Sequence, residues 1–197
     1  MKCCCKAPTE EEIIQNTRVK SCKNCGLIQK IEFLSFQEEK KRYDLHVCDE
    51  GYQNYLYKVF ERIKNEIKPG RVLDFGCGRI HLLADIIKEY GLDCSYYDLI
   101  YYPTFPDGSF DTIILVEVFE HLKNPYEELK RLEGILNSFG KIIIITQPYD
   151  DVDLEKWWYF RDKTHISFIQ KNTIEAWHLP FKILKKNGDI FVLERIY

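Results

Sequence analysis

The chain has 197 residues, of which 45% are hydrophobic and 30% are charged, and its formal net charge is −3 at pH 7. This length suits one well-packed domain with a modest appendage, and the composition is typical of a soluble globular protein. The small negative charge gives no overall attraction to nucleic acid or to an anionic membrane, and no run approaches the ~20 apolar residues that span a bilayer.

Cysteines are concentrated at the N-terminus, where residues 1–50 predict a cysteine-rich segment ahead of a main domain over residues 51–197. The first residues carry lysine and acidic side chains instead of an apolar run, so no secretory signal is expected and the predicted compartment is cytoplasmic and reducing. The pattern C-x-x-C-G at 22–26 is typical of a zinc knuckle. A vestigial ribbon and redox-active thiols are the alternatives to a structural zinc site. The four predicted zinc ligands are Cys3, Cys5, Cys22 and Cys25.

The rest of the chain alternates between helix and strand patterns. Residues 52–67 predict an amphipathic helix that Pro69-Gly70 ends. Asn187-Gly188 predicts a hairpin turn between two final strands. Parallel strands with intervening helices and a terminal antiparallel hairpin predict an α/β, Rossmann-like three-layer sandwich, with its ligand crevice at the carboxyl ends of the strands. Strands are expected at 71–75, 93–97, 112–116, 141–146, 181–186 and 190–195, and further helices at 81–90 and 125–137.

A glycine-rich turn follows the first parallel strand, where Gly76 and Gly78 let the backbone bend tightly and approach a ligand. Asp74 can accept hydrogen bonds from a ligand's ammonium group, and Asp98, at the end of the next strand, can take both ribose hydroxyls. His81 occupies the third glycine position of the dinucleotide fingerprint, which disfavours a nicotinamide or flavin cofactor. S-adenosylmethionine fits better because it is cationic and has no phosphate. A purely structural turn is the alternative.

Several stretches resemble known methyltransferases. Residues 73–78 are similar to motif I of class I S-adenosylmethionine-dependent methyltransferases, and residues 105–111, followed by an apolar strand and Glu-His-Leu, to their strand-four region. Residues 25–27, 42–46 and 158–165 resemble bacterial methyltransferases with a cysteine-bearing N-terminus. The resemblance implies the class I fold, methyl transfer as the activity and S-adenosylmethionine as the cofactor. The implied cofactor-binding residues are Asp74, Phe75, Gly76, Cys77, Gly78, Asp98, Leu99 and Glu117.

Two features depart from that family. Ile80 stands where the family usually has glycine, which crowds the amino-acid end of the cofactor or the approach of the helix. The loop from Leu99 to Asp107 is short, so the usual third strand and its adenine-contacting acid are expected to be missing, and Leu99 or Ile100 would stack on the adenine. These departures motivate an alternative function, a zinc-containing binding module on a degenerate methyltransferase scaffold.

A second constellation follows the strand at 112–116. In a helix, Glu117, Glu120 and His121 would share one face and suit Mg²⁺ or Mn²⁺, while Zn²⁺ or Fe²⁺ could be accepted. The E-x-x-E-H pattern resembles the metal motif of ubiquinone-pathway catechol-type O-methyltransferases and of small-RNA 3′-end 2′-O-methyltransferases. This resemblance implies His165 as a fourth ligand. Without a metal, His121 or His165 is the candidate general base.

The predicted function is methyl transfer to a small-molecule acceptor, with a hydroxyl favoured over nitrogen or carbon and a divalent ion assisting. An RNA-modifying enzyme remains an alternative that the acidic net charge disfavours, and no membrane partner is expected. Residues 157–159 are candidates for the acceptor pocket, and Arg42, Tyr43 and His46 for its cover, although packing roles are equally compatible with the sequence. Neither the acceptor nor the oligomeric state can be predicted from the sequence.

Overall fold

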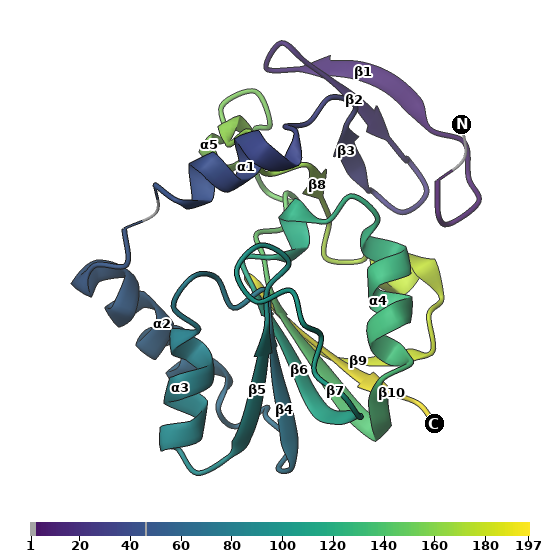
Figure 1. The fold of residues 1–197 in the computed structure, drawn as a ribbon. Helices are drawn as coiled ribbons and strands as arrows, with labels where there is room; N and C mark the ends of the chain where they lie inside the picture. The colour runs from purple at the N-terminus through teal and green to yellow at the C-terminus, as the bar shows by residue number, and fades with distance from the viewer. Residues whose placement is uncertain (1–2, 46) are drawn as a thin grey trace.

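The main sheet contains six strands in the order β5-β4-β6-β7-β10-β9 (Figure 1). The computed structural model describes residues 3–45 and 47–197. Strands β5, β4, β6 and β7 are parallel, and β10 pairs antiparallel with both β7 and β9. The predicted α/β, Rossmann-like sandwich with a terminal hairpin is therefore confirmed. The strands are β4 (Arg71–Phe75), β5 (Asp93–Tyr97), β6 (Phe110–Val116), β7 (Leu136–Ile145), β9 (Phe181–Asn187) and β10 (Ile190–Arg195).

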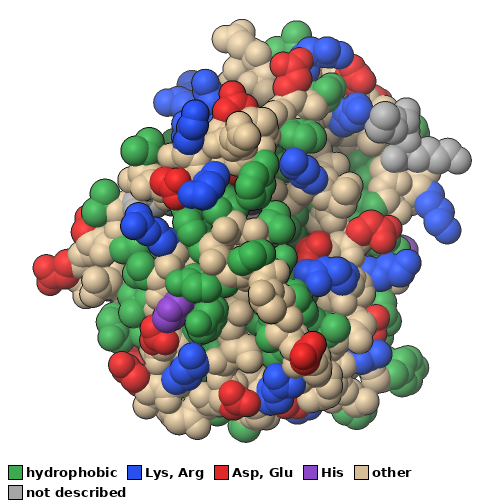
Figure 2. All heavy atoms as spheres, viewed as in Figure 1, with side chains coloured by type: hydrophobic (Ala, Val, Ile, Leu, Met, Phe, Trp, Pro, Cys, Tyr) green, Lys and Arg blue, Asp and Glu red, His purple; other side chains and the backbone are tan. Residues whose placement is uncertain are grey.

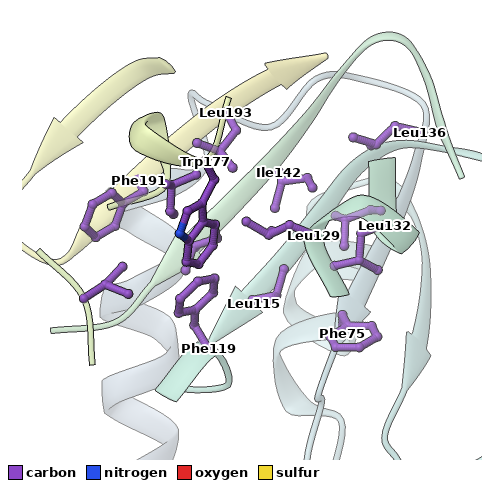
Figure 3. Packing of buried hydrophobic residues seen from close by; sticks show 14 of the residues in the cluster. Phe75, Leu115, Phe119, Leu129, Leu132, Leu136, Ile142, Trp177, Phe191 and Leu193 are labelled. Carbon is purple, nitrogen blue, oxygen red and sulfur yellow. The ribbon is translucent and has the colours of Figure 1, made fainter. Parts of the chain in front are cut away.

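Two hydrophobic clusters cover the two faces of this sheet. Successive side chains of a strand point to opposite faces, so Val72 and Ile114 pack in one cluster while Leu73 and Ile113 pack in the other. On the first face lie α2 (Glu50–Ile63) and α3 (Leu82–Glu89), and on the second lies α4 (Pro125–Glu133) with two short 3₁₀ helices, η1 (Phe119–His121) and η2 (Glu175–Trp177). Figure 3 shows the second cluster, where the Phe119 and Trp177 rings stack at 6.3 Å.

The bounds of some helices and strands differ from the predicted ones, because contacts with distant residues determine where they begin and end. The bounds of β4 and β5 are confirmed to the residue. α4 ends at Glu133 and β7 already begins at Leu136, because Leu136 is buried and pairs with Phe110 across the sheet. In the hairpin, Asn187 pairs with Ile190, so the turn consists of Gly188 and Asp189 and lies one residue later than predicted.

The loop between β5 and β6 confirms one departure from the usual family pattern. Among the described residues 98–109 there is no strand, only an isolated bridge between Asp98 and Tyr102. β5 is therefore an edge strand of the sheet, and this loop lies beside the carboxyl ends of the strands.

The N-terminal segment forms a second, four-stranded antiparallel sheet in the order β1-β2-β3-β8. Three strands come from the cysteine-rich region, and the fourth, β8 (Ser167–Phe168), comes from the C-terminal half of the chain. The two predicted regions thus share a sheet. The N-terminal elements are β1 (Glu10–Ile14), β2 (Thr17–Ser21), β3 (Ile28–Lys30) and α1 (Phe36–Tyr43), and the short helix α5 (Trp158–Arg161) precedes β8.

Lys30 fastens this second sheet to the segment that carries α5. Its buried ammonium group donates hydrogen bonds to the carbonyls of Phe160 (2.8 Å) and Asp162 (2.7 Å), and its backbone N–H donates to Ile166 (2.9 Å). Desolvation by burial lowers the pKa of Lys30 to about 8. The backbone carbonyls hold the lysine in place, and the lysine supplies the hydrogen-bond donors that these carbonyls need.

Within residues 3–45 and 47–197, every helix is too short or too polar to cross a lipid bilayer.

We predict that Lys30→Met destabilises the protein by about 2–4 kcal/mol, because one buried and one partly buried carbonyl lose their donor. Urea unfolding of this variant checks the expectation, with Lys58→Met on the exposed face of α2 as the control. An unfolding free energy within about 0.5 kcal/mol of the unsubstituted protein would contradict the proposed fastening.

Candidate functional site

A cavity of about 800 Å³ lies at the carboxyl ends of β4, β5 and β6. Its walls come from α1, the glycine turn, the loop after β5, the segment around η1 and residues 158–165. In the space-filling view, apolar side chains gather between the regions of α1 and α3 (Figure 2). The predicted site residues that line the cavity are Phe75, Gly76, Gly78, Asp98, Leu99, Glu117, His121 and His165, whereas Asp74, Cys77 and Glu120 are buried behind its wall.

The glycine turn after β4 needs glycine at its first position. Gly76 has a φ of 79°, and a Cβ there would lie 2.4 Å from the Cγ2 atom of Val118. The backbone N–H groups of Gly76 and Cys77 donate to the Tyr97 carbonyl at 2.7 and 3.1 Å. Gly78 also has a positive φ, of 65°. The turn is therefore pinned to β5 on one side and packed against Val118 on the other.

Asp98 is held at the cavity wall by backbone donors. Its carboxylate accepts hydrogen bonds from the N–H groups of Gly78 (3.1 Å), Ile100 (2.8 Å) and Tyr101 (3.0 Å). Since an ionised carboxylate offers about four acceptor positions, about one remains for a hydroxyl donor in the cavity. Two hydroxyls would need one of these backbone donors to move.

Asp74 is 2% exposed, and its Oδ2 atom has no hydrogen-bond partner among the described residues. Desolvation by burial raises the pKa of this carboxyl to about 7, against a smaller lowering by the Ala84 N–H. The side chain lies beneath the glycine turn and does not line the cavity. A hydrogen bond to a ligand's ammonium group from this position would therefore need a bridging water.

Ile80 lines the cavity, and the backbone strain of this region falls on His81 instead. His81 precedes α3 with a φ of 38°, and its ring stacks on Tyr96 at 4.4 Å. Ile80 does not adopt the left-handed conformation that favours glycine. Its side chain therefore affects the site through the volume that it occupies in the cavity, and not through backbone strain.

Glu117 follows β6 in the left-handed region, with a φ of 51°. This conformation is uncommon for a residue with a Cβ, and it persists where the surrounding structure fixes it. Here the carboxylate accepts hydrogen bonds from the hydroxyls of Tyr55 and Tyr159, each at 3.3 Å. Burial, and then the charge of Glu120, raise the pKa of Glu117 to about 8.

Three of the four predicted divalent-metal ligands come together. One ligand atom each of Glu120, His121 and His165 lies within 4.8 Å of the others. Glu117 is not in this group, and the expected α-helix is instead the 3₁₀ helix η1, because Glu117 leaves β6 in the left-handed region. The Glu120 Oε2 atom accepts from the Thr146 hydroxyl at 2.9 Å, whereas Oε1 has no hydrogen-bond partner among the described residues.

Backbone carbonyls orient both imidazoles. The Nδ1 atom of His121 lies 2.9 Å from the Thr164 carbonyl, and that of His165 lies 2.8 Å from the Tyr159 carbonyl. Because a carbonyl can only accept, Nδ1 carries the hydrogen in each ring and each Nε2 lone pair is free. Burial lowers the pKa of both histidines, that of His165 to about 4, so both rings are neutral at pH 7. Neutral imidazoles with an anchored Nδ1–H are typical of metal ligands and of general bases.

Two hydrogen-bond donors to these carboxylates, Tyr55 to Glu117 and Thr146 to Glu120, were not predicted from the sequence. Tyr55 belongs to the apolar stripe of α2, which indicated only packing, and Thr146 follows β7 with no motif of its own. Tyr43, a predicted cover residue, lines the cavity and its hydroxyl lies 3.0 Å from His121 Nδ1. Trp158 and Tyr159 also line the cavity. His46 lies outside the described residues.

The four predicted zinc ligands also lie together. Single sulfur atoms of Cys3, Cys5, Cys22 and Cys25 all lie within 4.8 Å of one another. The Cys3–Cys25 and Cys5–Cys22 pairs are 3.5 and 3.4 Å apart. A tetrahedral zinc–thiolate site would separate its sulfurs by about 3.8 Å, so a small expansion would accommodate the ion.

The comparisons with known proteins identify the family. The profile of a methyltransferase-domain family matches residues 29–178. The chain belongs to this family. The class I methyltransferase resemblance drawn from residues 73–78 is thereby confirmed. No curated protein sequence matches the chain.

Two solved structures share the fold. A magnesium protoporphyrin IX methyltransferase from Synechocystis PCC 6803, solved with bound SAH, has a TM-score of 0.51 and 15% identity, over 83% of this chain and 89% of that chain. An O-methyltransferase family protein from Burkholderia thailandensis has a TM-score of 0.52 and 10% identity, over 79% of this chain and 61% of its own. At these identities the similarity concerns the fold alone.

We predict that wild-type protein loses stability between about pH 5 and about pH 8, and that Asp74→Asn removes much of this loss. A carboxyl whose folded pKa is raised from 3.8 to about 7 favours the folded state at low pH, and this contribution disappears as pH rises through 7. The effect is on the order of 3 kcal/mol. Urea unfolding at both pH values measures it, with Asp107→Asn on an exposed loop as the control. If the unfolding free energies of the wild type and of Asp74→Asn fell by the same amount between the two pH values, this explanation would be contradicted.

Proposed function

We propose that this protein transfers a methyl group from S-adenosylmethionine to a hydroxyl of a small-molecule acceptor. The observation that supports it best is the single cavity that joins the glycine turn and Asp98 at one end to His121 and His165 at the other. Membership of the methyltransferase-domain family supports methyl transfer as the reaction class. The relative from Synechocystis was solved with bound SAH, the demethylated product of that cofactor, which supports the choice of methyl donor.

The residues around the glycine turn suit S-adenosylmethionine, which supplies a methyl group on a positively charged sulfur. Gly76 leaves no side chain between the turn and the cavity, and Asp98 offers an acceptor position for a ribose hydroxyl. Leu99, which is 66% exposed and lines the cavity, offers an apolar surface for the adenine. The Asp74 carboxyl, whose charged form burial disfavours, would be stabilised as an anion by a nearby cation.

The imidazoles of His121 and His165 can accept the proton that the acceptor hydroxyl loses. When the acceptor oxygen attacks the methyl carbon, the new C–O bond forms as the C–S bond breaks, and the hydroxyl proton must leave. A free Nε2 on His121 or His165 can accept that proton, because both Nδ1 atoms already donate to carbonyls. Tyr43 and Tyr159 border this position and help to hold the acceptor in line, which is the main requirement of such a displacement.

The group Glu120, His121 and His165 also fits a divalent ion. The free Oε1 atom of Glu120 and the two free Nε2 atoms form a mixed oxygen–nitrogen donor set, which Mn²⁺, Fe²⁺ or Zn²⁺ accepts readily and Mg²⁺ less so. A bound ion would occupy both Nε2 lone pairs, so it would replace the general base by lowering the pKa of the acceptor hydroxyl. Glu117 would not be a ligand and would keep its hydrogen bonds to Tyr55 and Tyr159.

A structural Zn²⁺ on Cys3, Cys5, Cys22 and Cys25 completes the proposal. Cys22 and Cys25 are buried in the same hydrophobic cluster as Phe119, so this site would stabilise the packing next to η1. A hydrogen bond with Cys4 lowers the pKa of Cys25 to about 4, whereas burial raises the pKa of Cys3 to about 12 and also raises that of Cys22, so zinc would have to displace the protons of those two thiols.

We predict micromolar binding of S-adenosylmethionine in a calorimetric titration. Asp98→Asn should weaken this binding between about tenfold and about a hundredfold, because a charged acceptor is lost. Asp93→Asn, at the first residue of β5 and outside the cavity, should bind as the unsubstituted protein does. No binding to folded protein would contradict the proposal and favour the binding module on a degenerate scaffold.

Binding of Mn²⁺, followed by electron paramagnetic resonance, checks the divalent site. We expect Glu120→Gln to weaken binding by about 10–100-fold, because the only carboxylate of the group is neutralised. Glu127→Gln, exposed on α4, is the matched control. Equal Mn²⁺ affinity in both variants would show that these three residues hold no metal, and the histidines would remain only as general bases.

Metal analysis of the purified protein checks the cysteine site. We expect about one zinc per chain, lost in Cys22→Ser and retained in Cys48→Ser, which lies outside the cluster. Chelation should also lower the melting temperature of the zinc-bearing protein. A zinc content below about a tenth of an ion per chain, in protein purified without chelator, would contradict the prediction.

A further inference from the structure

Aromatic rings surround the imidazole end of the cavity. The Tyr159 ring centroid lies 4.1 Å from that of His165, and the Tyr43 ring meets His121 edge-on at 5.6 Å. Trp158, which is 62% exposed, lines the cavity and packs edge-on against Tyr159. This end of the cavity, called the acceptor end below, therefore presents aromatic faces both inside and at its mouth.

Two carboxylates, rather than lysine or arginine side chains, line the acceptor end beside these rings. Glu39 lines the acceptor end from α1, and its carboxylate accepts a hydrogen bond from the Tyr43 hydroxyl at 3.3 Å. Asp162 also lines this end, and the N–H and hydroxyl of Thr164 donate to it at 2.8 and 2.7 Å. Arg42 approaches Asp162 to 3.4 Å from outside the cavity.

The balance of charge at the acceptor end is therefore negative. Glu39 forms no salt bridge with a lysine or arginine in the part of the chain that the structure describes. Among the described residues that line the cavity, Arg79 is the only lysine or arginine, and it belongs to the glycine turn at the other end. An anionic group placed beside Glu39 and Asp162 would lose water and gain no lysine or arginine partner from the cavity wall at this end.

We propose that the acceptor is an aromatic molecule without carboxylate or phosphate groups, and that Glu39 selects an ammonium substituent on it. This inference deepens the proposed function and rests on it. A cation between aromatic faces and a carboxylate gains both cation–π and Coulomb attraction. Glu39 comes from the N-terminal segment, so that segment would determine specificity as well as cover the cavity.

Three probes test this charge preference. Dopamine, ethylcatechol and dihydroxyphenylpropionate carry the same ring with two adjacent hydroxyls and a short side chain that is cationic, neutral or anionic. Calorimetry first measures S-adenosylhomocysteine binding, and each probe is then titrated into the saturated protein with Mg²⁺ present. We expect dopamine to bind about tenfold more tightly than the anionic probe, with ethylcatechol between them.

Glu39→Gln should reduce the ratio between dopamine and the anionic probe at least about threefold, whereas Glu32→Gln, an exposed carboxylate of the same segment outside the cavity, should leave it unchanged. Equal or tighter binding of the anionic probe, an unchanged ratio in Glu39→Gln, or no binding of any probe would overturn the inference. Failure of S-adenosylhomocysteine to bind in the first titration would instead overturn the proposed function, so the two failures are distinguishable.

Discussion

The close packing of Gly76 against Val118 brings the two halves of the site together. A Cβ at Gly76 would come within 2.4 Å of a Val118 methyl group, so the glycine turn and the segment after β6 share one wall of the cavity. Glu117 is on one side of Val118 and η1, with Glu120 and His121, is on the other. Because β4 and β6 are neighbouring parallel strands, their carboxyl ends impose this approach. The cofactor end and the acceptor end are thereby fixed relative to each other.

The second sheet extends this arrangement to the N-terminal segment. Lys30 satisfies two carbonyls of residues 160–162, and β3 pairs with β8, directly after His165. α1 then crosses to the cavity, where Tyr43 meets His121. The N-terminal segment is therefore part of the candidate site, since its sheet supports the loop of one histidine and its helix contacts the other.

Features that depend on a short stretch of sequence, such as the bounds of a strand or a cysteine motif, are the ones that the sequence predicts most reliably. The apolar run of β4 before the glycine turn, and the short segment of β5 between Gly91 and Asp98, indicate the bounds of these strands. The C-x-x-C-G pattern with the earlier cysteines indicates a sulfur cluster that the structure brings together. The N-terminal strands could not be predicted from local pattern. β1 begins with three exposed glutamates, and its sheet is completed only by β8, far along the chain. Tyr55 and Thr146 join Glu117 and Glu120 through tertiary packing, which leaves no local signature. The left-handed backbone of Glu117, which replaces the expected helix, likewise depends on its surroundings.

The central claim is that one cavity holds the methyl donor at the glycine turn and points its sulfur toward His121 and His165. A crystal structure of the protein with S-adenosylhomocysteine tests it most directly. The account predicts a ribose hydroxyl on Asp98, the adenine beside Leu99, and the sulfur facing the two imidazoles. A ligand bound outside this cavity, or bound with its sulfur directed away from both histidines, would contradict it.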